Sequence, residues 1–271
     1  MQSIPQPPHW RSAPALMNSL LTARRLGLIT DVDGTISPIV SQPEAAQVTP
    51  RSKALLAQLA GKLALVAVIS GRAAADVYRR VGIDGLVYVG NHGLERWRAG
   101  RVDLVPQAAR YRDALVGAVE LVRTHMIEGM QIEDKGATFS IHYRNVTQPE
   151  LVETTIAPLL TRAAEEHGIR LFRGRMVFEL RPPIDIDKGA AFASLVREFA
   201  LDGAVYLGDD TTDADALRMC GRLRAAGGCH AVGIGVSAAE APPAVLESAD
   251  VLANGIDDVE ACFDWLASHY R

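Results

Sequence analysis

The sequence has few cysteines and no long apolar run, and both absences narrow the class of protein. Its three cysteines, Cys220, Cys229 and Cys262, form no C-x-x-C pair and leave one unpaired in any disulfide scheme. This usage predicts buried free thiols in a reducing compartment. No apolar run approaches the roughly 20 residues of a membrane-spanning helix, and residues 1–25 contain no signal-peptide core. We therefore expect a cytoplasmic protein with no membrane partner.

An excess of positive charge is also missing. The chain has 28 Lys and Arg residues against 32 Asp and Glu residues, a formal net charge of -4. Because nucleic-acid-binding domains normally carry a strongly basic surface, we expect no nucleic-acid partner. A phosphate-bearing substrate would instead need locally placed Lys, Arg and metal. Nothing in the sequence indicates the oligomeric state, and a monomer is assumed.

The most informative stretch is LITDVDGTI at 28–36, where an apolar run ends in two carboxylates and Gly-Thr. Side chains two apart in an extended segment point the same way, so Asp31 and Asp33 can reach one small volume. Gly34 allows a sharp turn directly after them. Since close carboxylates repel unless a cation or proton relieves them, we expect a divalent metal, one Asp as nucleophile and the other as acid/base. The alternative is a simple Asp-Gly turn after a strand, although D-x-D-G-T is far more specific than that dipeptide.

Alternating strands and helices predict the fold class. The first part of the chain alternates apolar strand patterns with helical ones, and the same alternation returns after residue 188. This pattern is typical of a doubly wound parallel sheet, an α/β, Rossmann-like fold. The expected strands are 28–31, 63–69, 86–89, 204–207 and 230–236, and the expected helices are 51–60, 73–81, 188–200 and one within 255–270.

Between these two parts the order changes to helix, two strands, helix, two strands. Strand pairs joined by tight turns are antiparallel, which predicts an inserted α+β domain. We therefore expect a discontinuous core of residues 1–107 and 183–271 and a cap of residues 108–182. Within the core, residues up to 14 are expected to form a loose leader and 15–25 a short helix.

Polar residues follow four of the expected strands: Asp31 with Asp33, Ser70, Asn91 with His92, and Asp209 with Asp210 and Asp213. In a parallel sheet these strand ends share one edge, so the residues can converge. Magnesium typically takes one or two carboxylates, and Asp31, Asp209 and a backbone carbonyl near Asp33 would suit it. Alternatively, one of the acids after residue 208 caps the next helix.

Lys188, Ser70 and His92 each have a structural interpretation beside a functional one. Lys188 opens a helix, where the macrodipole disfavours a cation, so it is either held for an anion or simply solvated. Ser70 precedes a glycine and a helix start, and it either binds a phosphate or caps the helix. His92 lies between Asn91 and a glycine, a position that favours a loop residue over a metal ligand.

These residues occur in the order of the four motifs of the haloacid dehalogenase-like phosphatases, and the chain resembles the trehalose-6-phosphate phosphatases within that superfamily. The resemblance covers about residues 26–266, through the core and the cap. In one departure, Val32 stands where the family often has an aromatic residue, and we expect no functional effect. The motifs are DVDGT at 31–35, VISGR at 68–72, NHGLE at 91–95, EDKG at 133–136, HYR at 142–144, FELRP at 178–182, KGAA at 188–191 and GDDTTD at 208–213.

The resemblance implies a role for each core residue. Asp31 would form an aspartyl-phosphate and Asp33 would act as general acid and then base. Ser70 and Lys188 would hold the phosphate oxygens, and Mg²⁺ would bind Asp31, Asp33 (main chain) and Asp209. Gly34, Thr35, Asp210 and Asp213 would support the site, with Asp213 orienting Lys188 or a metal-bound water.

The resemblance also assigns the cap residues. Glu133, Lys135 and Glu179 would bind the sugar hydroxyls, and the weaker candidates for substrate binding are Arg72, Asn91, His92, Arg144 and Arg181. The ordinary reading of Glu133 and Lys135 is an exposed ion pair, which contributes little.

The leading hypothesis is a magnesium-dependent phosphatase that acts on trehalose 6-phosphate. Alternatives are a phosphatase of the same fold for another sugar phosphate, such as mannosyl-3-phosphoglycerate or sucrose phosphate, and a non-catalytic sensor or scaffold. The last is disfavoured because Asp31, Asp33 and Lys188 are all present.

Overall fold

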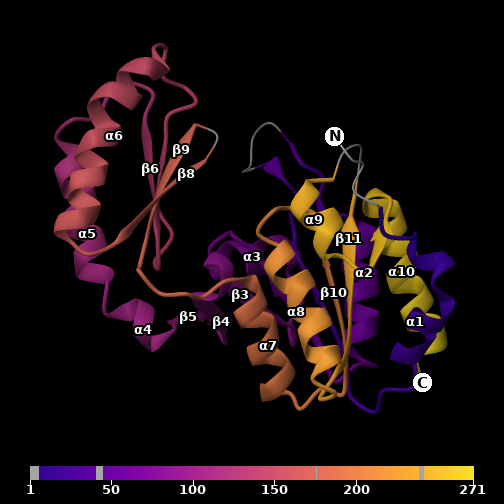
Figure 1. The fold of residues 1–271 in the computed structure, drawn as a ribbon. Coiled ribbons are helices and arrows are strands. Elements are labelled where there is room, and N and C mark those ends of the chain that lie inside the picture. Colours follow the sequence, from indigo (N-terminus) through magenta and orange to yellow (C-terminus); the bar gives the residue numbers. More distant parts are fainter. Residues whose placement is uncertain (1–5, 41–44, 175, 238–240) are drawn as a thin grey trace. The chain divides into compact units, whose positions relative to one another are not determined.

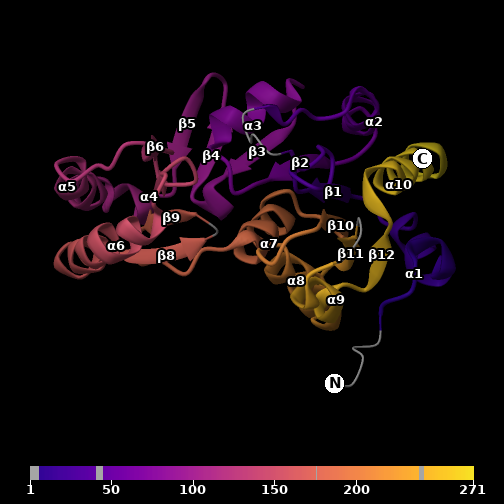
Figure 2. The ribbon, with the colours of Figure 1, turned by 90° about the horizontal axis from the view of Figure 1, so that it is seen from above.

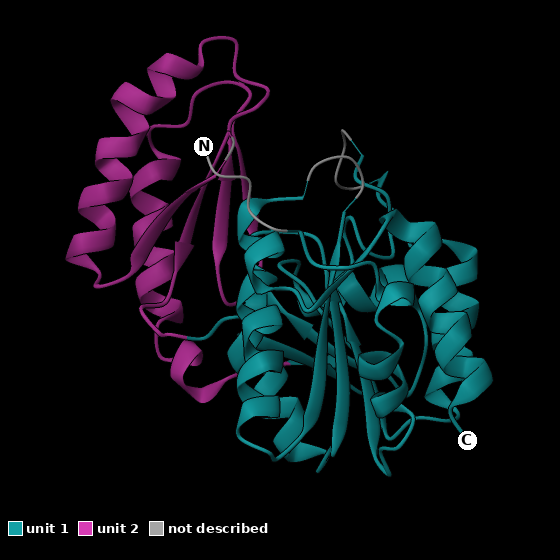
Figure 3. Ribbon diagram, turned by 45° about the vertical axis from the view of Figure 1, so that its right-hand side comes forward, with its two compact units in different colours: residues 1–102, 186–271 teal, residues 103–185 magenta. Residues whose placement is uncertain are grey.

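The computed structural model describes residues 6–40, 45–174, 176–237 and 241–271. The chain divides into two compact units, residues 1–102 with 186–271 and residues 103–185 (Figure 3). These divisions lie a few residues from the boundaries at 107/108 and 182/183 expected from the sequence. Among the described helices, none combines the length and apolar character that crossing a bilayer requires.

The larger unit is built on a mostly parallel sheet with the strand order β12-β11-β10-β1-β2-β3-β4-β5 (Figure 1). Strands from β12 to β3 are parallel and β4 pairs antiparallel with β3. Every residue of β1, β2 and β10 is buried, as continuous apolar runs in a sheet covered on both faces require. The strands are β1 (Leu26–Thr30), β2 (Leu65–Ile69), β3 (Val87–Gly90), β4 (Glu95–Arg98), β5 (Arg101–Leu104), β10 (Gly203–Gly208), β11 (His230–Val236) and β12 (Val251–Ala253).

Helices cover both faces of this sheet (Figure 2). One apolar cluster joins the sheet to α1, α2, α3 and α10, and the other joins it to α7, α8 and α9. Thr49 caps α2 by accepting a hydrogen bond from the Ser52 amide, with Pro50 in the first turn. The helices are α1 (Pro14–Leu20), α2 (Pro50–Ala60), α3 (Ala74–Val81), α7 (Lys188–Glu198), α8 (Ala214–Ala225), α9 (Pro243–Ser248) and α10 (Gly255–His269).

Two expectations about the amino-terminal segment are wrong. The helix expected to run from 15 to 25 ends at Leu20. The described part of the expected loose leader is attached to the core, because Trp10 is only 4% exposed and both His9 and Arg11 contact the Asp258 carboxylate at 2.6 Å. Burial of one indole together with an ion pair is enough to order this short segment.

Local sequence does not predict the short elements at the edges of the sheet. Strands β4, β5 and β12 and helix α9 were not anticipated. Each has three to six residues, too few for periodicity to identify it. The hydrogen-bonding edge of an existing sheet determines where such strands form.

The smaller unit is an antiparallel sheet with the strand order β6-β7-β9-β8, covered on one face by α5 and α6 (Figure 3). Its strand pairs alternate with helices, as the sequence predicts. Phe139, Ile141, Phe178 and Leu180 fill the core between sheet and helices. The elements are η3 (Asn91–Gly93) before the unit and, within it, α4 (Pro106–Ala109), α5 (Arg112–Arg123), β6 (Gln131–Asp134), β7 (Phe139–His142), α6 (Pro149–Glu166), β8 (Arg170–Gly174) and β9 (Val177–Arg181).

Candidate active site

The carboxyl ends of four adjacent strands carry the polar residues singled out in the sequence. In the sheet register, Thr30 of β1 lies beside Leu207 of β10 and Val68 of β2. The amide of Asp31 continues the ladder and donates to the Leu207 carbonyl at 2.9 Å. The loops that follow β1, β2 and β10 therefore begin next to one another, as the parallel arrangement predicts.

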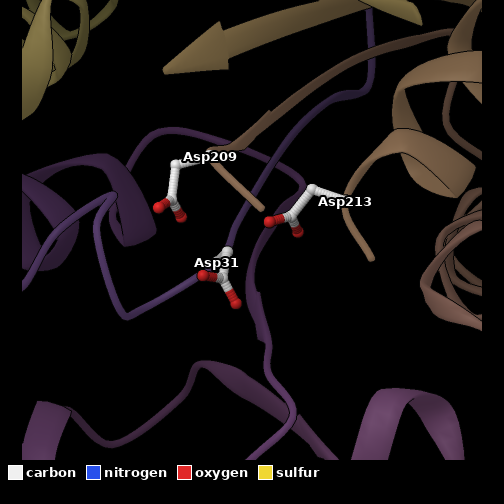
Figure 4. Close-up of side chains that lie close together, drawn as sticks. All are labelled: Asp31, Asp209 and Asp213. Atoms are coloured by element: carbon white, nitrogen blue, oxygen red, sulfur yellow. The ribbon is translucent and has the colours of Figure 1, made fainter. Parts of the chain in front are cut away.

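Three carboxylates meet at this edge. Oxygens of Asp31, Asp209 and Asp213 lie within 4.8 Å of one another (Figure 4). Asp31 follows β1, whereas Asp209 and Asp213 both follow β10. Asp31 is 4% exposed and Asp213 is completely buried. Close buried carboxylates are unfavourable without compensating positive charge, so the arrangement requires a cationic partner.

Lys188 supplies part of that charge. Its Nζ donates to Asp31 Oδ1 at 2.8 Å and to Asp213 Oδ1 at 2.7 Å, and Lys188 is only 2% exposed. Burial opposes the charged ammonium, but Asp213 and Asp31 outweigh it and raise the pKa of Lys188 above its ordinary value. The alternative interpretation, that Lys188 is a solvated lysine, is therefore wrong.

The position of Lys188 follows from the start of α7. The side chain of Asp187 accepts a hydrogen bond from the Ala190 amide at 2.7 Å and caps the helix. Lys188 is then the first helical residue. The Tyr206 hydroxyl also donates to Asp213 Oδ1, at 2.5 Å, and the Asp210 amide donates to Asp213 Oδ2 at 2.9 Å. Asp213 thus fixes the ammonium that faces Asp31.

Glycine is required at position 34 because of Asp209. Gly34 has a φ of +80°, and a Cβ atom there would lie 2.0 Å from Asp209 Oδ2. No side chain other than hydrogen fits such a distance, so the Asp209 carboxylate can lie against the turn that follows Asp31. The hydroxyl of Thr35 donates to Asp209 Oδ1 at 3.3 Å.

The donor set fits a hard divalent cation. Burial, followed by repulsion from Asp213, raises the pKa of Asp209 to about 7. Burial also raises the pKa of Asp31 well above its ordinary value; Lys188 counteracts this, while Asp213 and Asp209 add to it. Among the described residues, Asp31 Oδ2 and Asp209 Oδ2 accept no protein hydrogen bond, whereas both oxygens of Asp213 do. Asp31 and Asp209 are thus the suitable carboxylate ligands.

We expect Mg²⁺ to raise the melting temperature more at pH 8 than at pH 6. The raised pKa of Asp209 means that its contribution to folding is present at low pH and lost as pH rises toward 7, when the buried carboxylate must ionise. The ion relieves that cost, and protons compete with it at lower pH. Thermal unfolding with millimolar Mg²⁺ or with chelator checks this.

The control for this experiment is Asp209→Asn, which should be more stable than the wild type in chelator at pH 8 and should respond less to Mg²⁺. Equal Mg²⁺ responses of the wild type at both pH values, or an unaltered response in the variant, would contradict the assignment.

The side chain of Asp33 lies outside the acidic cluster, and its expected metal contact is through the main chain. Its carboxylate accepts hydrogen bonds from Arg72 Nε at 2.6 Å and Nη2 at 2.8 Å, and the acidic cluster contains Asp213 in its place. Arg72, expected to bind substrate, is itself held by Asp76 at 3.2 Å. A guanidinium pairs with a carboxylate through two parallel bonds, which fixes the direction of Asp33. The main chain of Asp33 stays the predicted metal ligand, as the resemblance implies.

The loop after β3 supports the loop after β2. The amide of Asn91 donates to the Arg72 carbonyl at 2.8 Å and the amide of His92 to the Ser70 carbonyl at 3.0 Å. Asn91 and His92 both have positive φ, and the Asn91 side chain is completely buried and donates to Glu95. The buried Asn91 thus supports the Ser70 loop.

Ser70 is 1% exposed, and its hydroxyl accepts a hydrogen bond from the Arg72 amide at 3.2 Å. No role was expected from the sequence for Tyr206, Asp76 or Glu95, which position Asp213, Arg72 and Asn91, respectively. Only Glu95 had a signal, since it belongs to the NHGLE motif. The Asp210 carboxylate stabilises its own loop by accepting a hydrogen bond from the Thr211 amide at 2.5 Å.

The smaller unit brings together most of the predicted cap residues. Lys135 Nζ lies 3.8 Å from Glu133 and 3.9 Å from Glu179, and Arg181 Nε donates to Glu179 at 2.8 Å. These side chains belong to one polar cluster on the sheet. Arg144 is exposed in the turn after β7, and no contact links it to that cluster in the described residues.

The chain is similar to known proteins over most of its length. The trehalose-phosphatase family model matches residues 29–244. A trehalose-phosphate phosphatase of Mycobacterium tuberculosis is 34% identical over 216 residues, which cover 74% of this chain and 53% of that protein. The chain thus spans about half the length of the curated relatives it matches.

Solved structures share the fold. The C-terminal domain of the Candida albicans trehalose-6-phosphate phosphatase superposes with a TM-score of 0.75 at 22% identity, covering 97% of this chain and 99% of that one. The C-terminal domain of the Candida albicans trehalose synthase regulatory protein has a TM-score of 0.69 at 14% identity, covering 96% and 99%. The family model spans most of the chain, including the acidic cluster, Lys188 and the smaller unit. The chain belongs to the trehalose-phosphatase family.

Proposed function

We propose that the protein hydrolyses trehalose 6-phosphate to trehalose and phosphate through an aspartyl-phosphate intermediate. The observation that carries the proposal is the buried contact of Lys188 with Asp31 beside Asp209. It pairs a carboxylate nucleophile with a fixed cation where a phosphate dianion would bind. Family membership supports the same reaction.

In the first step an oxygen of Asp31 attacks phosphorus, the bond from phosphorus to the sugar oxygen breaks, and Asp33 gives its proton to that oxygen. In the second step Asp33 takes a proton from water, the water oxygen attacks phosphorus, and the bond to Asp31 breaks. Phosphate and the unmodified carboxylate result, so one displacement is divided into two.

The surrounding residues act by charge and position. Lys188 neutralises a phosphate oxygen and is aimed by Asp213, whose distance of 2.7 Å supports that role. The Ser70 hydroxyl holds another phosphate oxygen. Asp31, Asp209 and the main chain of Asp33 would hold Mg²⁺, which when bound supplies further stabilisation of negative charge on the phosphoryl group.

The smaller unit is proposed to bind the sugar. Glu133, Lys135 and Glu179 present carboxylate and ammonium groups on one sheet face, which suits a ligand rich in hydroxyls. An ion pair alone would contribute little to stability at a surface.

We also propose a cytoplasmic location. The three free cysteines are buried, which supports it.

A substrate panel tests this function. Phosphate release from trehalose 6-phosphate is expected to exceed release from glucose 6-phosphate and sucrose 6-phosphate by about 100-fold in kcat/KM, because unsatisfied polar groups penalise the wrong sugar. Release should stop when chelator removes Mg²⁺. Faster turnover of another sugar phosphate would keep the core chemistry and overturn the substrate.

A non-catalytic sensor is the second candidate. It is favoured by one observation, that the same fold occurs in the regulatory protein of Candida albicans. The presence of Asp31, Asp33 and Lys188 argues against it. Absence of release from every sugar phosphate in the panel would make it the leading function.

A further inference from the structure

One face of the sheet in the smaller unit carries mainly polar side chains. Its other face packs Phe139, Ile141, Phe178 and Leu180 against α5 and α6. Side chains alternate between faces, so the intervening residues point away from the helices.

The strand register aligns four of these residues in one row. Glu133 of β6 lies opposite Ser140 of β7, Ser140 opposite Glu179 of β9, and Glu179 opposite Phe172 of β8. Residues directly opposite in antiparallel strands are on the same face, with Cβ atoms about 5 Å apart. The row thus runs from Glu133 through Glu179 to an aromatic ring.

Phe172 is the unusual member of this row. It is 42% exposed, although it is a large apolar residue on a face of acids and cations. Among the described residues of this unit it is the only exposed aromatic: the other exposed large apolar residues are aliphatic and lie on helices or in the loop after α5, namely Val116, Leu121, Met126 and Leu151. Exposed aromatic rings beside fixed polar groups are typical of ligand sites.

The ring of Phe172 is held by its neighbours. The guanidinium of Arg181 lies 4.6 Å from the ring centroid. Arg181 is in turn fixed by Glu179, to which its Nε donates at 2.8 Å. This contact orients the ring, while its exposure leaves part of the ring free to contact a ligand.

We propose that Phe172 is a specificity residue that stacks against a pyranose ring of the substrate, beside the hydroxyl-binding groups of Glu133, Lys135 and Glu179. The C–H groups of a sugar ring form an apolar surface that suits an aromatic ring, and its hydroxyls point outward to carboxylates and ammonium groups. The inference rests on the proposed function, and adds a non-polar contact to the polar ones. Phe172 is distinct from the reacting groups and acts on substrate binding.

The test compares KM and kcat for Phe172→Ala, Phe172→Leu and Phe172→Trp with trehalose 6-phosphate. Loss of the ring in Ala and in Leu should raise KM about 3- to 10-fold with kcat little changed, as expected for one aromatic contact. Phe172→Trp should retain the wild-type KM. Glycerol 2-phosphate, which has no ring, should be hydrolysed alike by all four proteins.

Leu151→Ala is the matched control, because Leu151 is 45% exposed on α6, which covers the opposite face of the sheet. Wild-type KM in Phe172→Ala, or rescue by Leu as complete as by Trp, would overturn the stacking role. Thermal unfolding of each variant identifies any that misfold. If Phe172→Ala misfolds, the KM of Phe172→Leu alone decides whether the ring contacts the substrate.

Failure of the proposed function gives a different result. If the wild type does not hydrolyse trehalose 6-phosphate, the same KM ratios are measured with the sugar phosphate that the panel identifies. A KM that depends on the Phe172 ring with that substrate would support the stacking role, although the substrate differs. No turnover of any sugar phosphate would overturn both.

Discussion

Replacing Asp31 by asparagine is expected to lower turnover by at least about 10⁴-fold while the protein remains folded. The amide has nearly the same shape as the carboxylate, and its oxygen can still accept the hydrogen bond that Lys188 donates to Asp31. The amide cannot form the acyl-phosphate, so two-step hydrolysis through that intermediate is lost. Steady-state phosphate release from trehalose 6-phosphate measures the effect.

The same substitution should stabilise the metal-free protein. Burial raises the pKa of Asp31 well above its ordinary value, so ionised Asp31 costs folding free energy at neutral pH, and the neutral amide removes that cost. Denaturant unfolding in chelator should therefore show Asp31→Asn at least as stable as the wild type.

Asp264→Asn is the matched control, since Asp264 is exposed on α10, and it should leave turnover unchanged. Residual activity of Asp31→Asn above about a hundredth of wild type would show that another group attacks phosphorus, because loss of a nucleophile normally exceeds that by far.

Replacing Lys188 by methionine is expected to have the second largest effect. Turnover should fall about 10²- to 10³-fold, the usual loss for one fixed electrostatic group. The unfolding free energy should fall by about 3–5 kcal/mol at pH 8, because Asp31 and Asp213 would be left buried without their shared cation.

The pH dependence of Lys188→Met separates this cause from loss of packing. Without the ammonium, the already raised pKa of Asp31 rises further, so the folded variant is favoured at low pH and loses stability as pH rises. Denaturant unfolding at pH 6 and pH 8 measures the difference. Lys53→Met, on the half-exposed part of α2, controls for loss of a lysine. A pH-independent destabilisation would show that the charge contact is not responsible.

Much of the site can be read from local sequence because each residue lies next to the end of a buried strand. The apolar runs at 28–31, 63–69 and 204–207 predicted β1, β2 and β10, and parallel strands have their carboxyl ends at one edge. The sequence alone therefore predicts that Asp31 and Asp209 lie close together at this edge. Gly34 was expected only to turn the chain, whereas the structure shows that Asp209 excludes any side chain there.

Other features depend on contacts between distant parts of the chain. Lys188 is 157 residues from Asp31, and its ordinary and functional readings were equally compatible with the sequence until the structure showed it buried between two carboxylates. Arg72 and Asp33 are likewise joined through a fold that local pattern does not specify. The aromatic Tyr206, part of a buried strand, gave no signal of its bond to Asp213.

By itself, the sequence determined the order of the longer strands and helices, the inserted antiparallel unit, and the identities of the acids at the strand ends, because periodicity and turn residues are local properties of the chain. Tertiary structure alone decided that the Asp213 carboxylate joins those of Asp31 and Asp209 and that Lys188 lies between Asp31 and Asp213. It also decided that Asn91 supports a loop while Phe172 stays exposed. The physical reason is that burial, charge compensation and pKa depend on what surrounds a group in space, and those neighbours come from strands and helices far apart in the sequence.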